Sequence, residues 1–294
     1  RFANGPWTSR TTLPAGYSDY GAFDELYDRN EAVLRRILET ALAAPRAKAD
    51  RNTTMLRDYY GACMDSAGAE RDGGRPIVGL LADLDGLTST KDLGRQVAWL
   101  HQHGINALFG FGAEQDDRNS EAVIGTMRQG GLGLPERGYY VRTDSATAAT
   151  RAIYQRSAAN LLQLAGESSE AAAAHAAAVM GFETALALAS KTNVERRDPK
   201  ANYNRLSWDA LVALAPRFDW AAYRTGRGFA AGDVNVRQTR FVQAIDSLVA
   251  ATPLDTWKAY LRVRVLFDAA PTLSTPYVKE WFRSEERHVG KECR

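Results

Sequence analysis

Apolar residues recur at steps of three and four along most of the chain, a spacing that places them on one face of an α-helix. Residues that favour helix ends bound these stretches, with Ser, Asp or Pro before them and Gly or Pro after them. The pattern predicts a short helix that begins at Pro76 and longer helices over residues 18–42, 53–66, 89–103, 145–165, 168–190, 207–215, 238–251 and 254–269.

The first two of the longer helices carry clear apolar stripes. Ser18 or Asp19 is expected to cap the first helix, whose stripe runs from Phe23 to Leu42. The stripe of the second helix runs from Met55 to Cys63. We expect the second stripe to be buried, and we expect Cys63 to be an inert thiol within it.

Two short apolar runs differ from the helical pattern. Residues 105–112 and 121–128 flank the sequence Asp116-Asp117-Arg118-Asn119, which is typical of a turn. This arrangement predicts a β-hairpin. The glycine at position 104 fits a left-handed helix end. The predicted fold class is therefore mainly α with one small β-hairpin, and the short loops favour one continuous helical domain.

The charge balance argues against several kinds of partner. The 294 residues include 37 Lys or Arg and 35 Asp or Glu, for a net charge of +2. No segment alternates basic with aromatic residues, so we expect no nucleic-acid partner. No run of about 18 apolar residues is present, so we expect no membrane-spanning segment. Two distant cysteines form no disulfide framework and leave the redox compartment undecided.

The histidines do not have the spacing of a metal site. His101 and His103 are two residues apart on a predicted helix and point to different faces, and their place near its C-terminus favours a structural role. His175 lies alone in an alanine-rich stretch. The sequence contains no His-Glu-x-x-His, nucleophile-elbow or phosphate-loop motif. No catalytic or metal-ligating residue is therefore assigned in this chain.

Two polar clusters are interpreted as structural. Arg197 and Asp198 precede Pro199, which fits an ion pair that fixes a turn beside a helix. The adjacent acids Asp116 and Asp117 fit a solvated hairpin turn better than a catalytic pair of carboxylates.

Both ends of the chain are interpreted as incomplete. The chain begins at Arg1 within a turn, so we expect any signal peptide or anchor to lie upstream. Residues 283–294 lack helical periodicity and resemble the translation of a short-read sequencing adapter. We interpret them as a sequencing artefact that is not native, which leaves residues 1–282 as the native domain and removes His288 and Cys293 from any site.

Several short motifs are spread over nearly all of the chain up to Phe282. They are Phe-Ala-Asn-Gly-Pro-Trp (2–7), Tyr-Gly-Ala-Phe-Asp (20–24), Tyr-Tyr-Gly-Ala-Cys-Met-Asp (59–65), Gly-Leu-Pro-Glu-Arg-Gly-Tyr-Tyr (133–140), Arg-Arg-Asp-Pro (196–199) with Tyr-Asn (203–204), Leu-Ala-Pro-Arg-Phe-Asp-Trp (214–220) and Tyr-Leu-Arg (260–262). In this order they resemble the N-terminal domain of the neprilysin and endothelin-converting-enzyme family of zinc metallopeptidases. The resemblance is to a bacterial-type member that ends before the catalytic domain.

The resemblance implies that residues 1–282 form a helical cap domain of a two-domain metallopeptidase. In that family the cap admits peptides of limited size, and a later domain binds zinc through a His-Glu-x-x-His helix and a downstream glutamate. This chain would be the substrate-selecting part of a zinc metalloendopeptidase, with peptide substrates and the missing catalytic domain as partners. Alone it would bind no zinc and have no activity. The family also implies an exported protein of the periplasm or cell envelope.

Two alternatives stay open at this point. The chain is then either a non-catalytic helical module that binds peptides or proteins, or an unrelated helical scaffold. The DNA downstream of the codon for Phe282 distinguishes the enzyme from the binding module. A His-Glu-x-x-His encoded there supports the enzyme, and a stop codon supports the binding module.

Three positions depart from the pattern of the family. In animal members, an arginine before the Tyr-Gly pair and another on the following helix help to bind the C-terminal end of the substrate. Asp19 and Tyr27 stand there in this sequence, and a carboxylate would repel a substrate carboxylate. We expect both residues to contact substrate without favouring the release of dipeptides. Gly138 replaces the usual aspartate and is expected to loosen the turn before Tyr139.

Overall fold

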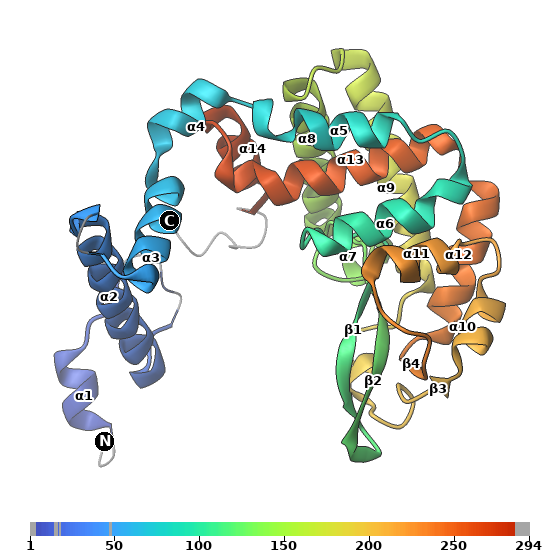
Figure 1. Ribbon diagram of the computed structural model, residues 1–294, viewed down its shortest axis with the longest axis horizontal. Coiled ribbons are helices and arrows are strands. Elements are labelled where there is room, and N and C mark those ends of the chain that lie inside the picture. The colour runs from blue at the N-terminus through green and yellow to red at the C-terminus, as the bar shows by residue number, and fades with distance from the viewer. Residues whose placement is uncertain (1–3, 15–16, 18, 47–48, 286–294) are drawn as a thin grey trace. The chain divides into compact units, whose positions relative to one another are not determined.

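The computed structural model describes residues 4–14, 17, 19–46 and 49–285 (Figure 1). Most of them are helical, and a small sheet accompanies the helices, which confirms the predicted fold class. The chain divides into two compact units, with residues 1–72 in unit 1 and residues 73–284 in unit 2. This division differs from the expectation of one continuous domain. It falls at Gly73, whose φ of 58° lies in the left-handed region and interrupts the helical path.

Unit 1 contains α1 (Gly5–Arg10), α2 (Ala22–Ala43), α3 (Arg51–Met64) and α4 (Ser66–Asp72). Gly21 is the N-cap of α2, and its N–H donates to the carboxylate of Asp24 at 2.7 Å. Asp19 is therefore not the cap, and Ser18 lies outside the described residues. Asp50 caps α3 by accepting from the backbone N–H of Thr53 at 2.7 Å.

The apolar stripes of unit 1 are largely exposed, so the prediction that the stripe of α3 is buried is wrong. Ala41 is the buried residue of α2, whereas Phe23 is 88% exposed and Tyr59 of α3 is 75% exposed. Cys63 is a free and exposed thiol, which also corrects the expectation of a buried one. Two packed helices offer each other too little surface to cover both stripes. The exposed set further includes Leu26, Val33, Leu34, Ile37, Leu42, Met55, Leu56 and Met64.

Unit 2 is built mainly of helices. A 3₁₀ turn (Arg75–Ile77), with Pro76 near its start, leads into α5 (Val78–Asp85). Gly104 has a φ of 79° just after α6, as expected for a left-handed helix end. The other helices are α6 (Leu93–Gln102), α7 (Gly138–Val141), α8 (Ser145–Leu164), α9 (Ser169–Ala189), α10 (Trp208–Leu214), α11 (Trp220–Arg227), α12 (Thr239–Ala251), α13 (Leu254–Ala269) and α14 (Thr275–Glu285). The pattern does not predict α1, α4, α7 and α11. Residues 283–294, which we interpret as an artefact, include the end of α14, and the others among them lie outside the described residues.

The predicted hairpin forms one side of a four-stranded sheet. Strands β1 (Phe109–Asp116) and β2 (Asn119–Gln129) pair antiparallel, with Phe109 opposite Gln129. Two short strands, β3 (Arg205–Leu206) and β4 (Val234–Val236), complete the order β1-β2-β4-β3, in which β2 and β4 are parallel. The hairpin is confirmed, although β1 begins later than expected.

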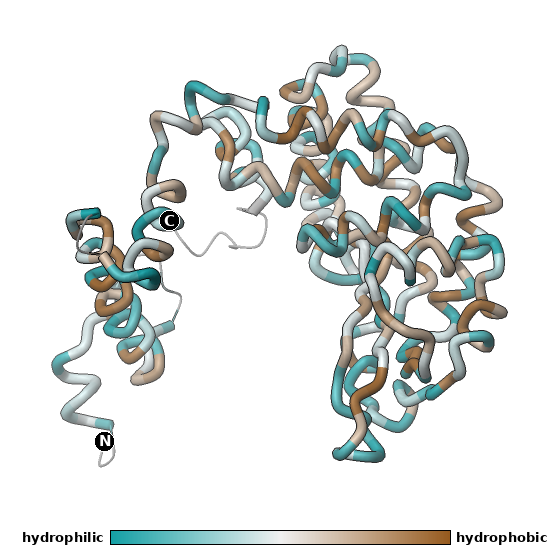
Figure 2. Tube along the Cα trace, in the orientation of Figure 1, coloured by the Kyte–Doolittle hydropathy of each residue, from teal (hydrophilic) through white to brown (hydrophobic). Residues whose placement is uncertain are grey.

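The core of unit 2 is formed by long helices that pack against one another. By length and composition α9 is apolar enough to cross a membrane, which differs from our expectation that no segment would qualify. In the structure α9 packs against α8 and α13, and its residues Val179, Phe182 and Leu186 are buried there. Figure 2 shows hydrophobic stretches along these helices. The apolar composition of α9 is thus explained by its place in the core.

Aromatic rings fix the start of β1 in this core. The ring of Phe109 lies 5.7, 5.5 and 5.1 Å from the ring centroids of Phe218, Trp220 and Tyr223. Contacts between aromatic rings at such distances stabilise a pair beyond the area it buries. The ring of His101 on α6 also lies 5.3 Å from that of Phe109, so the first residue of the hairpin is held between α6 and α11.

A buried carboxylate joins α8 and α9 to the loop that follows β2. Glu183 of α9 is fully buried. The hydroxyls of Tyr140 and Tyr154 donate to its two oxygens at 2.6 and 2.8 Å, and the N–H of Gly133 donates at 3.1 Å. Burial raises the pKa of Glu183, and the charge of Arg264 and these hydrogen bonds oppose that rise in part. The loop is thus fixed by a charge-assisted network.

The same loop is tied to the start of the sheet by Tyr260 of α13. The Tyr260 hydroxyl donates to the carbonyl of Gly131 at 2.8 Å and accepts from the N–H of Leu108 at 2.8 Å. Gly131 has a φ of 77°, and a Cβ there would collide with the Tyr260 hydroxyl and the Leu108 backbone. Position 131 therefore requires glycine.

Two helical glycines should respond oppositely to alanine. In Gly94→Ala, the new Cβ would meet the backbone carbonyl of Asp219, where α6 packs closely against α11, and overpacking of this kind costs about 1–3 kcal/mol. Gly181→Ala, in α9, adds a methyl to open space, and helix propensity should stabilise it by about 0.5–1 kcal/mol. Urea unfolding of the 294-residue chain measures both, and equal effects would contradict the close approach.

Replacement of Glu183 should weaken unit 2 in a pH-dependent way. Glu183→Gln removes the carboxylate that accepts two buried hydroxyls, which should cost about 3 kcal/mol. Folding raises the pKa of Glu183, so the folded state holds this proton more tightly than the unfolded state does. Protonation of Glu183 therefore adds to the stability of the wild type. This added stability is fully present below the unfolded pKa and is lost as the pH rises through the folded pKa. The stability gap between wild type and variant should thus widen on acidification.

The matched control for this prediction is Glu170→Gln on the same helix. Glu170 is exposed, so the change should lie within about 0.5 kcal/mol. Urea unfolding measured from neutral to acidic pH compares the two variants, and equal losses for both would exclude the role given to Glu183.

Candidate functional site

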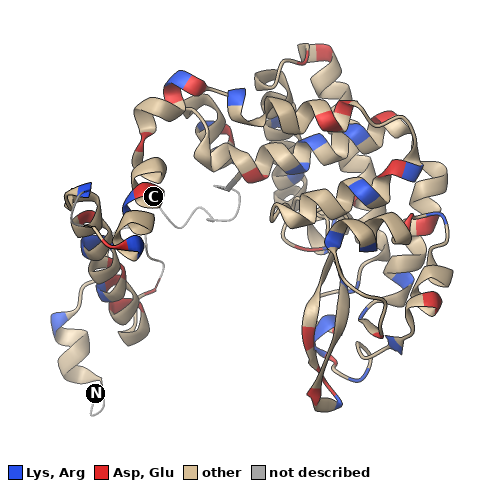
Figure 3. Cartoon of the chain, viewed as in Figure 1, with Lys and Arg blue, Asp and Glu red and all other residues tan. Residues whose placement is uncertain are grey.

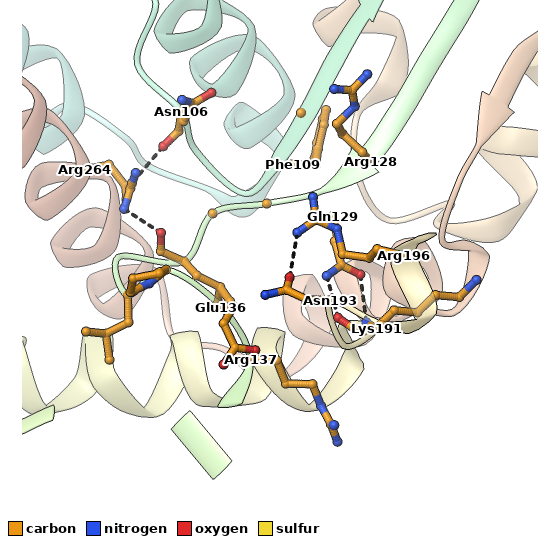
Figure 4. Close-up of a pocket in the computed structure, with 16 residues that line it drawn as sticks. Asn106, Phe109, Arg128, Gln129, Glu136, Arg137, Lys191, Asn193, Arg196 and Arg264 are labelled. Carbon is orange, nitrogen blue, oxygen red and sulfur yellow. Dashed lines mark hydrogen bonds between the residues drawn. The ribbon is translucent and has the colours of Figure 1, made fainter. Parts of the chain in front are cut away.

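The loop after β2 lines a cavity of about 300 Å³ in unit 2. The ends of β1 and β2, the segment that follows α9, and α13 form the other walls (Figure 4). In Figure 4, Arg264 lies on one side of the cavity and Arg128, Lys191 and Arg196 lie on the other. The charged side chains that line it are Arg128, Glu136, Arg137, Lys191, Arg196 and Arg264.

The cavity is strongly basic, because five cationic side chains and one carboxylate line it. Arg128 forms an ion pair with Glu114, just outside the cavity. In the part of the chain that the structure describes, the other four cations have no ion-pair partner. Burial and the charges of Arg237 and Arg196 lower the pKa of Arg128. The local field therefore disfavours additional positive charge and favours an anion.

Arg264 is held rigidly at the cavity wall. Its Nε donates to the carbonyl of Asn106 at 2.8 Å, and its Nη1 donates to the carbonyl of Leu132 at 3.1 Å. These bonds orient the half-buried guanidinium and do not use its Nη2. The planar guanidinium of Arg264 thus has a fixed orientation, and its Nη2 is still available as a donor. Such a group is suited to bind the oxygen atoms of an anion.

Gln129 positions the cationic segment that follows α9. Its side chain accepts from the N–H of Lys191 at 2.8 Å and donates to the Lys191 carbonyl at 2.9 Å. The ammonium of Lys191 donates to the carbonyl of Ala201 and to the side-chain oxygen of Asn202. Both acceptors are neutral and neither lines the cavity, and the charge of Lys191 helps to lower the pKa of Glu195.

Arg137 and Glu136 have different roles at the cavity edge. The Nε of Arg137 is buried and has no hydrogen-bond partner among the described residues. The carboxylate of Glu136 accepts from the N–H of Gly138 at 2.9 Å and so holds the first turn of α7. A Cβ at Gly138 would meet this carboxylate. The turn that we expected Gly138 to loosen is thus held by Glu136.

Asp19 and Tyr27, the substrate-contacting residues predicted from the resemblance, belong to unit 1 and do not line this cavity. Asp19 is exposed before α2, and Tyr27 on α2 is 61% exposed. A hydrogen bond to Glu31 raises the pKa of Tyr27. Their role as substrate contacts stays a prediction.

The histidines make structural contacts. The ring of His101 contacts the Tyr223 hydroxyl at 2.9 Å and the Ala107 carbonyl at 2.8 Å, and burial lowers its pKa. His175 lies between the carboxylates of Glu167 and Asp255, at 2.8 and 3.2 Å. Burial lowers the pKa of His175, but these two partners outweigh it and the pKa is raised.

Other polar residues differ from the expectations. Asp116 is buried rather than solvated, because it accepts from Arg205 at 2.9 Å. Asp198 accepts from the backbone N–H groups of Lys200 and Ala201 at 2.9 and 3.1 Å, so it fixes its turn through these amides and forms no ion pair with Arg197 among the contacts of the described residues. In the same part of the chain, no group of three or more His, Cys, Asp or Glu residues is arranged to hold a metal ion. No zinc-dependent step is therefore derived from these residues.

The sequence pattern did not reveal the basic cavity. Its lining residues come from four separate segments between Asn106 and Arg264. Two of the motifs behind the family resemblance, 133–140 and 196–199, contain Glu136, Arg137 and Arg196. These motifs were the only part of the sequence analysis that pointed to the cavity residues. They do not indicate that Arg264 lines the same cavity.

Comparison with known proteins places the chain in a family. Residues 1–292 match the N-terminal domain of peptidase family M13. Endothelin-converting enzyme-like 1 of Rattus norvegicus is 28% identical over 294 residues, which cover 94% of this chain and 37% of that protein. Endothelin-converting enzyme 1 of Homo sapiens is 29% identical over 231 residues, which cover 76% of this chain and 29% of that protein.

Solved structures agree with this result. The zinc metalloprotease ZMP1 of Mycobacterium tuberculosis, solved in complex with an inhibitor, superposes with a TM-score of 0.89 at 28% identity, over 99% of this chain and 44% of that chain. PepO from Lactobacillus rhamnosis shares the fold, with a TM-score of 0.79 at 20% identity, over 99% of this chain and 46% of that chain. This chain thus spans less than half of the length of these relatives. The predicted family is confirmed, and the chain belongs to peptidase family M13.

Proposed function

We propose that this chain is the substrate-selecting N-terminal part of a zinc metalloendopeptidase that cleaves peptides of limited size. Membership of peptidase family M13 supports the peptidase, and the basic cavity is the observation that carries the selecting role. The chain spans 37% of endothelin-converting enzyme-like 1 of Rattus norvegicus. The zinc ligands and the catalytic base are therefore expected in a later part of the full-length protein, and the chain alone is inactive.

The size and chemistry of the cavity suit a short piece of peptide. A volume of about 300 Å³ is at the lower end of small-ligand sites, enough for one side chain or one chain end. Its donors are guanidinium and ammonium groups, which bind carboxylate and carbonyl oxygens. A folded protein surface would not enter it.

The exposed stripes of unit 1 support a further partner within the same protein. Phe23, Tyr27 and Tyr59 are among the large apolar side chains that α2 and α3 leave exposed. Contiguous apolar surface on a folded domain usually contacts another protein surface. We propose that the catalytic part of the full-length protein covers these stripes, and that the protein is exported, in keeping with the family.

The alternative is a non-catalytic helical module that binds peptides or proteins. The same cavity and the same exposed stripes fit this function, since neither requires zinc. The two functions differ in whether the full-length protein contains a zinc-binding catalytic domain after this chain.

The full-length protein tests the main proposal. We expect it to contain a His-Glu-x-x-His motif after this region and to cleave a short quenched-fluorescent peptide. A zinc chelator should abolish the cleavage and added Zn²⁺ should restore it. The 294-residue chain should show no cleavage with or without Zn²⁺. A full-length protein without the motif and without zinc-dependent cleavage would establish the binding module instead.

The residues predicted in unit 1 have their own test. In the full-length enzyme, Asp19→Arg and Tyr27→Arg should each lower KM for a peptide with a free C-terminal carboxylate by about fivefold, the scale of one partly exposed ion pair. KM for the matching amide should not change. Asp83→Arg on α5 is the control, because Asp83 is exposed and the charge change is the same as in Asp19→Arg. No difference between the two peptides in any variant would show that neither position contacts the substrate.

A further inference from the structure

The basic cavity has an excess of positive charge, although nearby carboxylates balance part of it: Glu114 pairs with Arg128, and the charge of Arg264 acts on Glu183. Over most of unit 2, acidic and basic residues are interspersed along the helices (Figure 3). At the cavity, five cations face one carboxylate, and Glu136 uses that carboxylate to hold the N–H of Gly138. The buried Glu183 lies behind the loop, where its oxygens accept from Tyr140 and Tyr154. The lining residues therefore give the cavity a net positive field.

The donors that face this field are arranged before any ligand arrives. Arg264 is oriented by two backbone carbonyls, and the loop on which one of them lies is anchored by Glu183 and Tyr260. A donor that is already fixed loses little entropy when it binds an anion.

We infer that the cavity is a carboxylate-binding site for peptides, with Arg264 and Arg196 as its ligands and Arg137 and Lys191 as additional positive charge. This inference rests on the proposed function, because it names the class of peptide that the domain selects. The carboxylate belongs either to an acidic side chain or to the C-terminus of the peptide. Guanidinium groups bind both through paired N–H···O bonds.

A carboxylate fits better than a more highly charged anion. The cavity holds one small group, and the carboxylate of Glu136 at its edge repels a second negative charge. The whole chain has a net charge of only +2, so a polyanion gains little attraction beyond the cavity. A singly charged group on a peptide therefore matches the site.

Calorimetric titration of the 294-residue chain at low salt tests the inference. The probes are acetyl-Ala-Glu-Ala-amide, its glutamine analogue, acetyl-Ala-Ala-Ala with a free carboxylate, and inorganic phosphate. We expect the glutamate peptide or the free-carboxylate peptide to bind at least tenfold more tightly than the glutamine amide, and the tighter of the two identifies the source of the carboxylate. Equal binding of all three peptides, or binding of phosphate alone, would overturn the inference.

Two variants assign the binding to the cavity. Arg264→Gln should weaken binding of the carboxylate peptide at least tenfold, but it also loses bonds that support the fold. Arg196→Gln is the second variant, since Arg196 is exposed and makes one bond of 3.3 Å to Asn193. It should weaken binding about threefold with unchanged thermal stability, the effect of losing one partly exposed charge.

Arg156→Gln on α8 is the matched control. Arg156 is exposed and outside the cavity, and the variant has the same net charge as Arg196→Gln. Its binding should equal that of wild type. If Arg156→Gln and Arg196→Gln weaken binding equally, the attraction is a property of the net charge and the inference fails.

The result for carboxylate binding can be distinguished from the result for the proposed peptidase function. A full-length protein that cleaves neutral peptides with zinc, while the chain shows no preference for a carboxylate, retains the proposed function and excludes this site. A chain that binds the carboxylate peptide, from a full-length protein without peptidase activity, retains the site and excludes the enzyme.

Discussion

The buried carboxylate of Glu183 connects several elements of unit 2. A carboxylate that loses its water is stable only when nearby groups supply hydrogen bonds and opposite charge. Two tyrosine hydroxyls, one backbone amide and the charge of Arg264 do so. Because these groups lie on α7, α8, α13 and the loop after β2, none of these elements moves without disturbing the rest. The basic cavity is formed on this fixed frame.

The two units differ in how far they bury their apolar residues. Unit 2 buries large aromatic side chains such as Trp257, Tyr260 and Phe109 in one core. Unit 1 has the same helical periodicity, but its stripes have no comparable cover within the described part of the unit. Helical spacing shows which residues share a face, whereas burial depends on whether another element covers that face. The missing cover is the physical basis for proposing that further protein packs on unit 1.

Much of the fold could be predicted from local sequence, because the long helices carry periodic stripes and caps such as Ser168 and Asp144. Strands β3 and β4 could not, since two or three residues show no alternation. The exposed Cys63 was wrongly predicted for a related reason: its neighbours in sequence look like a core. The cavity was missed because Arg137 and Arg264 come to line one cavity only through the tertiary fold. Asp19 and Tyr27 came from family resemblance alone, so local physics gives no check on them.

The exposed stripes of α2 and α3 also have a consequence for synthesis in the cell. Unit 1 precedes unit 2 in the chain, so the ribosome releases these helices first. Their apolar faces, with Phe23 and Tyr59 outward, stay open to other chains while all of unit 2 is still being made. Unit 2 has a complete core and can finish folding as soon as it emerges. The earliest segment is thus the one that most needs a chaperone, although it is the first to acquire its helices.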